Sequence, residues 1–112
     1  MKSTNLIFLI FCLFFVANLG CNYSKTKKES NKTAEEYVES ATLKFKSQDL
    51  EGALQDCNKA IDLNPKCITA YIRRGETKFV LQDIDGACKD WRKAGDLGND
   101  AGYRMAESTC GK

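Results

Sequence analysis

The chain has 112 residues, of which 17 are basic and 15 acidic, and its formal net charge is +2 at pH 7. This length accommodates one small domain, and the near-balance of charge argues against a nucleic-acid binder, which usually carries a strongly basic stripe. The chain has no histidine, so neither a Ser-His-Asp nor a Cys-His catalytic arrangement can form within it. We therefore expect a protein that is not an enzyme and that uses no metal or other cofactor.

The amino terminus has the pattern of a secretory signal peptide. Lys2 precedes an unbroken run of twelve apolar residues, Leu6–Ala17. A membrane-spanning helix needs roughly 20 apolar residues, so this run is short for a permanent span and matches the core of a signal peptide. We expect residues 1–20 to form the signal peptide.

The apolar run is followed by Asn18-Leu19-Gly20-Cys21, which resembles the lipobox of bacterial lipoproteins. Gly20 and Cys21 match, whereas Asn18 stands where that family prefers leucine and Leu19 where it prefers a small residue. The resemblance implies a lipid on Cys21 and a location in the bacterial cell envelope, because several acyl chains hold a protein on a membrane. The residues after Cys21 lack the acidic cluster that some surface-exported lipoproteins carry, so the family analogy favours a periplasm-facing membrane. The alternative is ordinary cleavage near the same place, which gives a secreted protein without lipid.

The segment after Cys21 is polar and lacks hydrophobic periodicity. Together with the lipidated cysteine it forms residues 21–32, which we expect to be a flexible linker between the anchor and the folded part.

Residues 34–67 and 68–101 are related by a shift of 34 positions, and 12 of the 34 pairs are identical. The identical pairs include Tyr37/Tyr71, Phe45/Phe79, Gly52/Gly86, Ala53/Ala87 and Ala60/Ala94. A fixed period of this length indicates stacked helical hairpins, which bind other molecules far more often than they catalyse reactions.

The first hairpin has clear start and stop signals. Thr33 and Glu36 form a capping box, which predicts a helix that runs to about residue 47. Asp49 is suited to cap a second helix, and Asn64-Pro65 ends it because proline cannot continue a helix.

The second hairpin repeats these signals. A third helix is expected over about 68–81, with Tyr71, Ile72, Gly75 and Phe79 facing inward. Asp83 is suited to cap a fourth helix, which ends at Gly98-Asn99 because glycine adopts the left-handed conformation of a helix end. A fifth helix over about 100–109 closes the stack.

Small residues at the repeat period, such as Ala53 and Ala87, let helices approach closely, and aromatic residues fill the gaps between them. In these features the chain resembles the tetratricopeptide repeat (TPR) family. The resemblance implies an all-α fold with two antiparallel helix-turn-helix hairpins at 33–67 and 68–101. A C-terminal capping helix and tail follow at 102–112.

The resemblance also implies a groove, formed by the first helix of each hairpin, that holds a segment of a partner protein. The candidate groove residues are Val38, Thr42, Phe45, Ile72, Arg73, Glu76 and Phe79. Some family members clamp a terminal carboxylate with a set of lysine and asparagine side chains. That set is missing here, so this ligand is not expected. Arg73-Arg74 is interpreted as a solvated surface pair, and the alternative is pairing with a carboxylate, for which arginine is suited.

Four cysteines lie in the repeats and the capping helix. Cys88 and Cys110 are equidistant from Asn99, which lies in the loop between the fourth and fifth helices. Residues placed in this way face each other across a helical hairpin, so a disulfide between them is the first expectation. For Cys57 and Cys67 the distance along the second helix makes a bridge harder to form, and buried free thiols are the alternative reading.

The leading functional hypothesis is a membrane-anchored lipoprotein that acts as a protein–protein interaction module. The first alternative is a structural protein that self-associates, either as a homo-oligomer or a filament, because two repeats are few for binding. A small enzyme or redox factor is the third, and the absence of histidine and of a Cys-x-x-Cys pair disfavours it.

Overall fold

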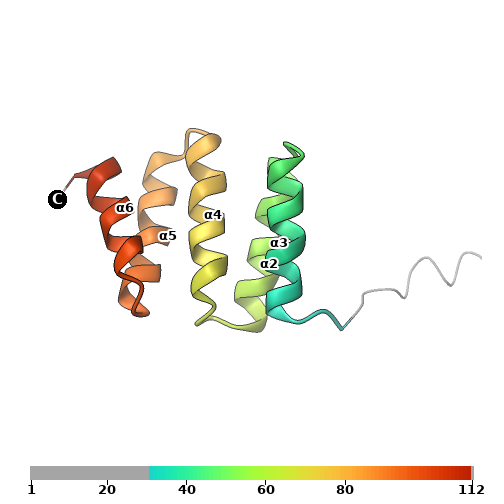
Figure 1. Ribbon diagram of the computed structural model, residues 1–112. Helices are drawn as coiled ribbons and strands as arrows, with labels where there is room; N and C mark the ends of the chain where they lie inside the picture. The colour runs from blue at the N-terminus through green and yellow to red at the C-terminus, as the bar shows by residue number, and fades with distance from the viewer. Residues whose placement is uncertain (1–30, 112) are drawn as a thin grey trace, which may run out of the picture. The chain divides into compact units, whose positions relative to one another are not determined.

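The computed structural model describes residues 31–111, and this part of the chain is all-α with five helices packed as successive hairpins (Figure 1). The helices are α2 (Ala34–Lys46), α3 (Leu50–Leu63), α4 (Ile68–Val80), α5 (Ile84–Asp96) and α6 (Asp100–Cys110). The expected signal peptide at 1–20, the lipidation site Cys21 and most of the linker lie outside the described residues. No helix within 31–111 has the length and apolar character that crossing a membrane requires.

The helices begin where the sequence predicts. Thr33 accepts a hydrogen bond from the Glu36 backbone N–H, and the Glu36 side chain accepts one from the Thr33 N–H, which completes the capping box of α2. Asp49 and Asp83 accept from the backbone N–H groups of Gly52 and Gly86, so α3 and α5 have equivalent caps.

Three of the four turns between helices share one geometry. Gln48, Gln82 and Gly98 adopt positive φ values of 68°, 66° and 108°. The residue that follows each of them donates its backbone N–H to a carbonyl in the last turn of the preceding helix: Asp49 to Lys44, Asp83 to Lys78 and Asn99 to Ala94. This six-residue closure is the Schellman motif, which satisfies carbonyl groups left free at a helix end.

The turn between α3 and α4 is of another kind. Asn64 adopts an extended conformation with φ −141°, and its side chain accepts a hydrogen bond from the Lys66 backbone N–H. Pro65 follows it and is held by the hydroxyl of Tyr71, which donates to the Pro65 carbonyl at 3.0 Å. This turn therefore marks the boundary between the two repeats.

The loop after α5 departs from the 34-residue period. Position 99 corresponds to Pro65, but it holds asparagine, which accepts a hydrogen bond from the Gly102 backbone N–H at 3.0 Å and caps α6. Helix α6 therefore begins at Asp100 and includes two residues that the period assigns to the second repeat. As a result α6 aligns with α4 at a shift of 32 positions, which places Tyr103 over Tyr71.

The core consists of small side chains on facing helices, filled in by a few large ones. Alanines at 41, 53, 60, 70, 87, 94 and 106 are almost fully buried. Trp91 is 3% exposed and takes the largest space among them, packed with Ala87 and Ala106. Gly75 faces the indole so closely that a Cβ there would lie 2.5 Å from Trp91 Nε1. The small residues thus set the helix spacing, as the sequence predicts.

Two expectations about single residues are wrong. Phe79 was expected to face inward, but it is 42% exposed at the end of α4. Its ring contacts Trp91 of α5, with the two centroids 5.8 Å apart, and the rest of the ring is open to solvent. Arg74 was expected to be a solvated surface residue, but its side chain is 20% exposed and is paired with the buried Asp90.

The expected bridge between Cys88 and Cys110 is present and joins α5 to the last residue of α6, with Cα atoms 6.3 Å apart. By the chain-entropy estimate a closed loop of this length stabilises the folded state by about 3 kcal/mol. Cys57 and Cys67 are buried free thiols, so no second bridge forms between them. Burial raises the pKa of the Cys57 thiol to about 12, so it stays protonated and unreactive at neutral pH.

Candidate functional site

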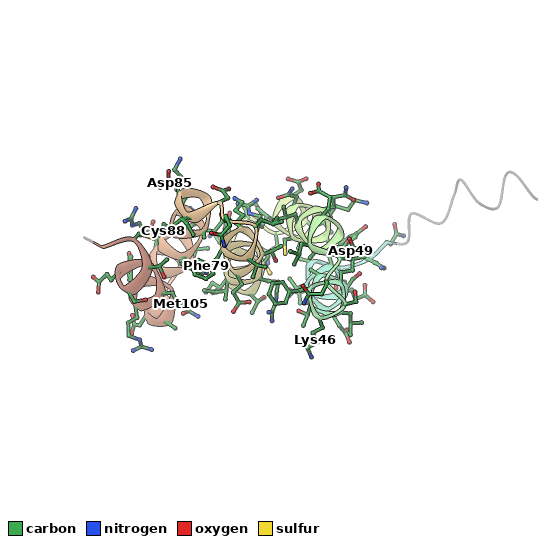
Figure 2. All side chains as sticks on the ribbon, turned by 90° about the horizontal axis from the view of Figure 1, so that it is seen from above. Lys46, Asp49, Phe79, Asp85, Cys88 and Met105 are labelled. Carbon is green, nitrogen blue, oxygen red and sulfur yellow. A yellow bond between two sulfur atoms is a disulfide. The ribbon has the colours of Figure 1, made fainter. Side chains whose placement is uncertain are left out.

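A pocket of about 380 Å³ opens among α2, α4, α5 and α6. It is lined by Phe45, Arg73, Glu76, Phe79, Val80, Trp91, Met105, Ser108 and Thr109. Most of the lining residues belong to α4 and α6. Figure 2 looks down on the helices and shows Phe79 on α4 and Met105 on α6, with Asp85 at the outer edge of α5.

The apolar part of the pocket is built from aromatic side chains. The rings of Phe79 and Trp91 are tilted at 41° with their centroids 5.8 Å apart, a favourable geometry for an aromatic pair. Phe45 packs against the small residues of the first hairpin and presents the rest of its ring to the pocket. Phe79 and Val80 are 42% and 45% exposed, so the pocket offers an apolar surface to a ligand from solvent.

Its charged part is a single ion pair. Arg73 donates from Nη1 to Glu76 at 2.6 Å, one helical turn apart on α4. The guanidinium also lies over the ring of Phe45, 5.6 Å from the centroid, which couples α4 to α2 through a cation–π contact. Arg73 Nε and Trp91 Nε1 are buried and have no hydrogen-bond partner among the described residues.

The structure brings together four of the seven candidate groove residues in this pocket: Phe45, Arg73, Glu76 and Phe79. The other three are engaged elsewhere. Val38 packs against the cluster around Ala60, and Ile72 packs against the cluster around Trp91. Thr42 donates its hydroxyl to the Val38 carbonyl at 2.8 Å within α2.

The α6 side of the pocket is not among the candidate residues predicted from the sequence, because residues 102–112 resemble a capping helix and tail. A shift of 32 positions would have revealed that contribution, since it places Met105 over Arg73 and Ser108 over Glu76. The cue is Asn99-Asp-Ala-Gly102, which repeats the spacing of Asp83-Ile-Asp-Gly86 and indicates another capped helix start.

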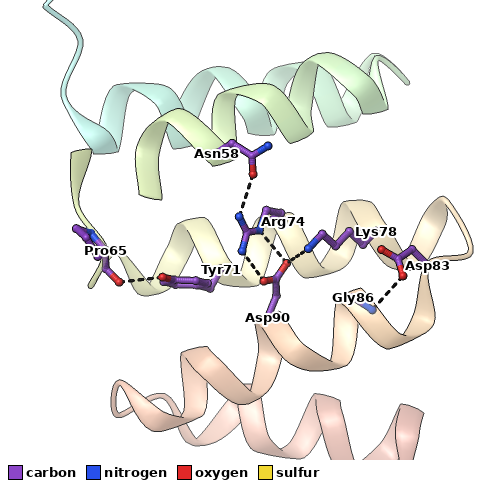
Figure 3. A network of polar contacts seen from close by, with 8 residues as sticks. All are labelled: Asn58, Pro65, Tyr71, Arg74, Lys78, Asp83, Gly86 and Asp90. Atoms are coloured by element: carbon purple, nitrogen blue, oxygen red, sulfur yellow. Dashed lines mark hydrogen bonds and ion pairs between the residues drawn. The ribbon is translucent and has the colours of Figure 1, made fainter. Parts of the chain in front are cut away.

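A polar network holds α4 in place behind the pocket (Figure 3). Arg74 donates to both carboxylate oxygens of Asp90, from Nε at 2.9 Å and from Nη2 at 2.7 Å, and Lys78 pairs with the same carboxylate at 2.9 Å. Arg74 also donates from Nη1 to Asn58 on α3 at 2.9 Å. The hydrogen bonds to Asp90 raise the pKa of Arg74, so its charge is fixed and the network joins three consecutive helices.

The first repeat contains a reduced version of this network. Asp56, which is equivalent to Asp90, accepts from the Ser40 hydroxyl at 2.6 Å and pairs with Lys44 at 2.8 Å. Burial acts to raise the pKa of Asp56, but the hydrogen bonds from Lys44 and Ser40, together with the positive charges of Lys44 and Lys32, outweigh it, and the pKa is lowered. Both repeats therefore hold their two helices together with a buried, charged aspartate.

No three cysteine, aspartate or glutamate side chains within residues 31–111 come together as metal ligands do. The pocket joins an apolar surface to one ion pair and two hydroxyl groups. This is an arrangement for binding, since large apolar side chains with a few polar groups are typical of ligand pockets.

A solved structure with the same architecture is the first TPR of Spaghetti (RPAP3), bound to the HSP90 peptide SRMEEVD. The two chains are 27% identical with a TM-score of 0.66, and the match covers 78% of this chain and 71% of that one. No family model and no curated protein matches the chain. The helix order, the hairpin packing and this likeness define a TPR-like helical repeat protein, a fold that typically binds other molecules without catalysis.

Proposed function

We propose that the chain is a protein–protein interaction module whose pocket takes a peptide segment of a partner protein. The observation that carries this proposal is the exposed apolar pocket across α2, α4 and α6. The structurally similar TPR of Spaghetti was solved with a bound peptide, which supports a partner of the same kind.

The chemistry of the pocket indicates which peptides fit. Phe45, Phe79 and Trp91 offer aromatic faces, which bury a large apolar side chain well. Arg73 is already paired with Glu76, so the pocket presents no free cation cluster to a terminal carboxylate. The partner segment is therefore anchored by an apolar or aromatic residue rather than by its terminus.

The experiment is capture of the partner through a tag placed after Lys112, from gently solubilised membranes, followed by the same capture with variants. Replacement of Phe45 and Phe79 by alanine is expected to abolish recovery of a stoichiometric partner, because it removes two aromatic walls. The matched control replaces Leu43 and Leu63 by alanine in the same way. These residues are 62% and 58% exposed and lie outside the pocket. That control is expected to recover the partner normally.

Phe45 contacts the core, so its loss can weaken the fold. Phe79→Glu is a second variant, which changes one exposed residue and places a charge in the apolar pocket. If a variant with unchanged circular dichroism still captures the partner in equal amount, the pocket is not the binding site. Recovery of the chain alone, or only with itself, would favour the alternative of a self-associating structural protein.

We also propose that the module is a lipoprotein of the bacterial cell envelope, anchored through Cys21 to a periplasm-facing membrane. The apolar run Leu6–Ala17 and the sequence Asn18-Leu19-Gly20-Cys21 support this. Mass spectrometry of the membrane-extracted protein should find acyl groups on Cys21, and Cys21→Ser should move the protein to the soluble fraction. An unmodified amino terminus in the mature protein would instead indicate a secreted form without lipid.

A further inference from the structure

Helix α6 carries both one end of the disulfide and one wall of the pocket. Cys110 is the last residue of α6, and Ser108 and Thr109, which line the pocket, immediately precede it. Met105, the third pocket residue on α6, lies one turn earlier. The bridge to Cys88 thus holds the half of α6 that forms one wall of the pocket.

Apart from the bridge, helix α6 is held by its packing against α5. Its buried residues are Gly102 and Ala106, and Ala106 packs against Trp91 on α5. At Gly102 the backbone of α6 lies against the backbone of α5, since a Cβ there would lie 2.5 Å from the Trp91 carbonyl oxygen. Small residues remove little apolar surface from water, so their contribution to holding a helix is modest.

The strongest of these contacts gather at the start of α6. Gly102 and Tyr103 lie in its first turn, where the Tyr103 hydroxyl donates to Asp96 and the ring covers Gly95. Toward the end of the helix the contacts are the partly buried Met105, Ala106 and the disulfide. The bridge therefore provides most of the restraint on the last turn.

We propose that thiol–disulfide exchange at Cys88–Cys110 is a redox switch that completes or dismantles the pocket. In the oxidised form α6 is pinned and supplies its wall, whereas in the reduced form its last turns detach and expose Trp91. This regulation rests on the peptide-binding function proposed above, because the pocket it controls is that binding site.

The exchange requires a dithiol reductant. One thiolate of the dithiol attacks Sγ of Cys110, the less buried of the two cysteines, and Cys88 leaves as a thiolate that takes up a proton. The second thiol of the reductant then attacks the mixed disulfide and releases the Cys110 thiol. The chain gains two hydrogens and two electrons, and the reductant is oxidised to a disulfide.

The test is hydrogen exchange of the full chain, compared between the oxidised form, the form reduced with dithiothreitol and the double variant Cys88→Ser with Cys110→Ser. Amides in the last turns of α6 are expected to exchange on the order of 100-fold faster without the bridge, as expected for opening a loop of this length. Amides of α2 and α3 that exchange through local opening of the first hairpin should exchange at an unchanged rate. Trp91, the single tryptophan, should become more accessible to acrylamide in the same two forms.

Dithiothreitol added to the double serine variant is the control and should change nothing further. Equal acceleration of exchange in all five helices would overturn the proposal, since the bridge would then stabilise the whole domain rather than one wall. Unchanged exchange of α6 would overturn it as well. If α6 opens as expected but the oxidised chain captures no partner, the switch is supported and the peptide-binding function fails.

Discussion

At the scale of single residues, each repeat is stabilised by one buried aspartate. Asp56 and Asp90 occupy the same position in their repeats and are 7% and 4% exposed. A buried charge is tolerated only when it is paired and hydrogen-bonded, and each of these carboxylates accepts from two side chains of the preceding helix. The pairs differ in strength because Arg74 makes a two-pronged contact, whereas Ser40 donates a single hydrogen bond.

This difference gives the first prediction. Asp90→Asn should lower the free energy of unfolding by about 3 kcal/mol, because it leaves the Arg74 and Lys78 charges without their buried partner. Asp56→Asn should cost about 1 kcal/mol, because Lys44 is 38% exposed and water compensates its charge. Urea denaturation of both variants and the parent chain measures the two losses. An equal loss of unfolding free energy in the two variants would contradict the inference that Asp90 is held more strongly than Asp56.

The lowered pKa of Asp56 gives a second prediction, on pH. A carboxylate whose pKa is lower in the folded state stabilises it above the unfolded-state pKa, about 3.9, and loses this effect as the pH falls through the folded-state value. The stability difference between the parent chain and Asp56→Asn should be constant from about pH 5 to about pH 8. It should shrink below about pH 4. A stability difference that grows on acidification would mean that the pKa of Asp56 is raised, not lowered, in the folded state.

At the scale of elements, the tight turns are the features that the sequence alone describes least well. Gln48 and Gln82 adopt left-handed conformations at φ 68° and 66°, which cost a residue with a Cβ atom roughly 1–2 kcal/mol. In the third turn of this kind the position is Gly98. The repeat comparison shows that Gln48 and Gln82 are equivalent, but nothing in a glutamine predicts a positive φ.

The third prediction concerns these turns. Gln48→Gly and Gln82→Gly should each raise the free energy of unfolding by about 0.5 kcal/mol, because relief of backbone strain exceeds the extra freedom of glycine in the unfolded chain. Gly98→Gln should lower it by about 1–2 kcal/mol, because φ 108° lies outside the region open to other residues. Thermal unfolding of the three variants tests the signs. Loss of stability in both glycine variants would show that the glutamine side chains have a role beyond the turn.

At the scale of the whole described domain, the question is whether two copies of the chain associate through the ends of the helical stack. The exposed residues of α6 outside the pocket include Arg104 and Glu107, and the exposed residues of α3 include Gln55 and Lys59. Polar end helices are the capping device that keeps repeat proteins soluble. Two of the exposed large apolar residues, Phe79 and Val80, belong to the pocket, whereas the others are outside it: Leu43, Leu63, Leu81 and Tyr103.

The fourth prediction follows from these polar ends. The oxidised chain should sediment as a monomer whose sedimentation coefficient does not change with concentration. Arg104→Leu with Glu107→Leu is the matched comparison, since it creates an apolar face on α6 and should promote association. Association of the parent chain, weakened by Phe79→Glu, would favour the self-associating alternative and place the interface at the pocket.

The sequence by itself determined the helices, their caps and their pairing into hairpins, because these depend on local hydrogen bonds and on a repeat that can be read by shifting the chain. It also determined the bridge between Cys88 and Cys110, since equal distance from a turn fixes which residues face each other. Only the tertiary structure decided the pocket, because its α6 wall depends on a two-residue change of register after Asn99. Only the tertiary structure showed that Arg74 pairs with the buried Asp90, since adjacent residues on a helix point about 100° apart and a small rotation of α4 decides which arginine meets this carboxylate.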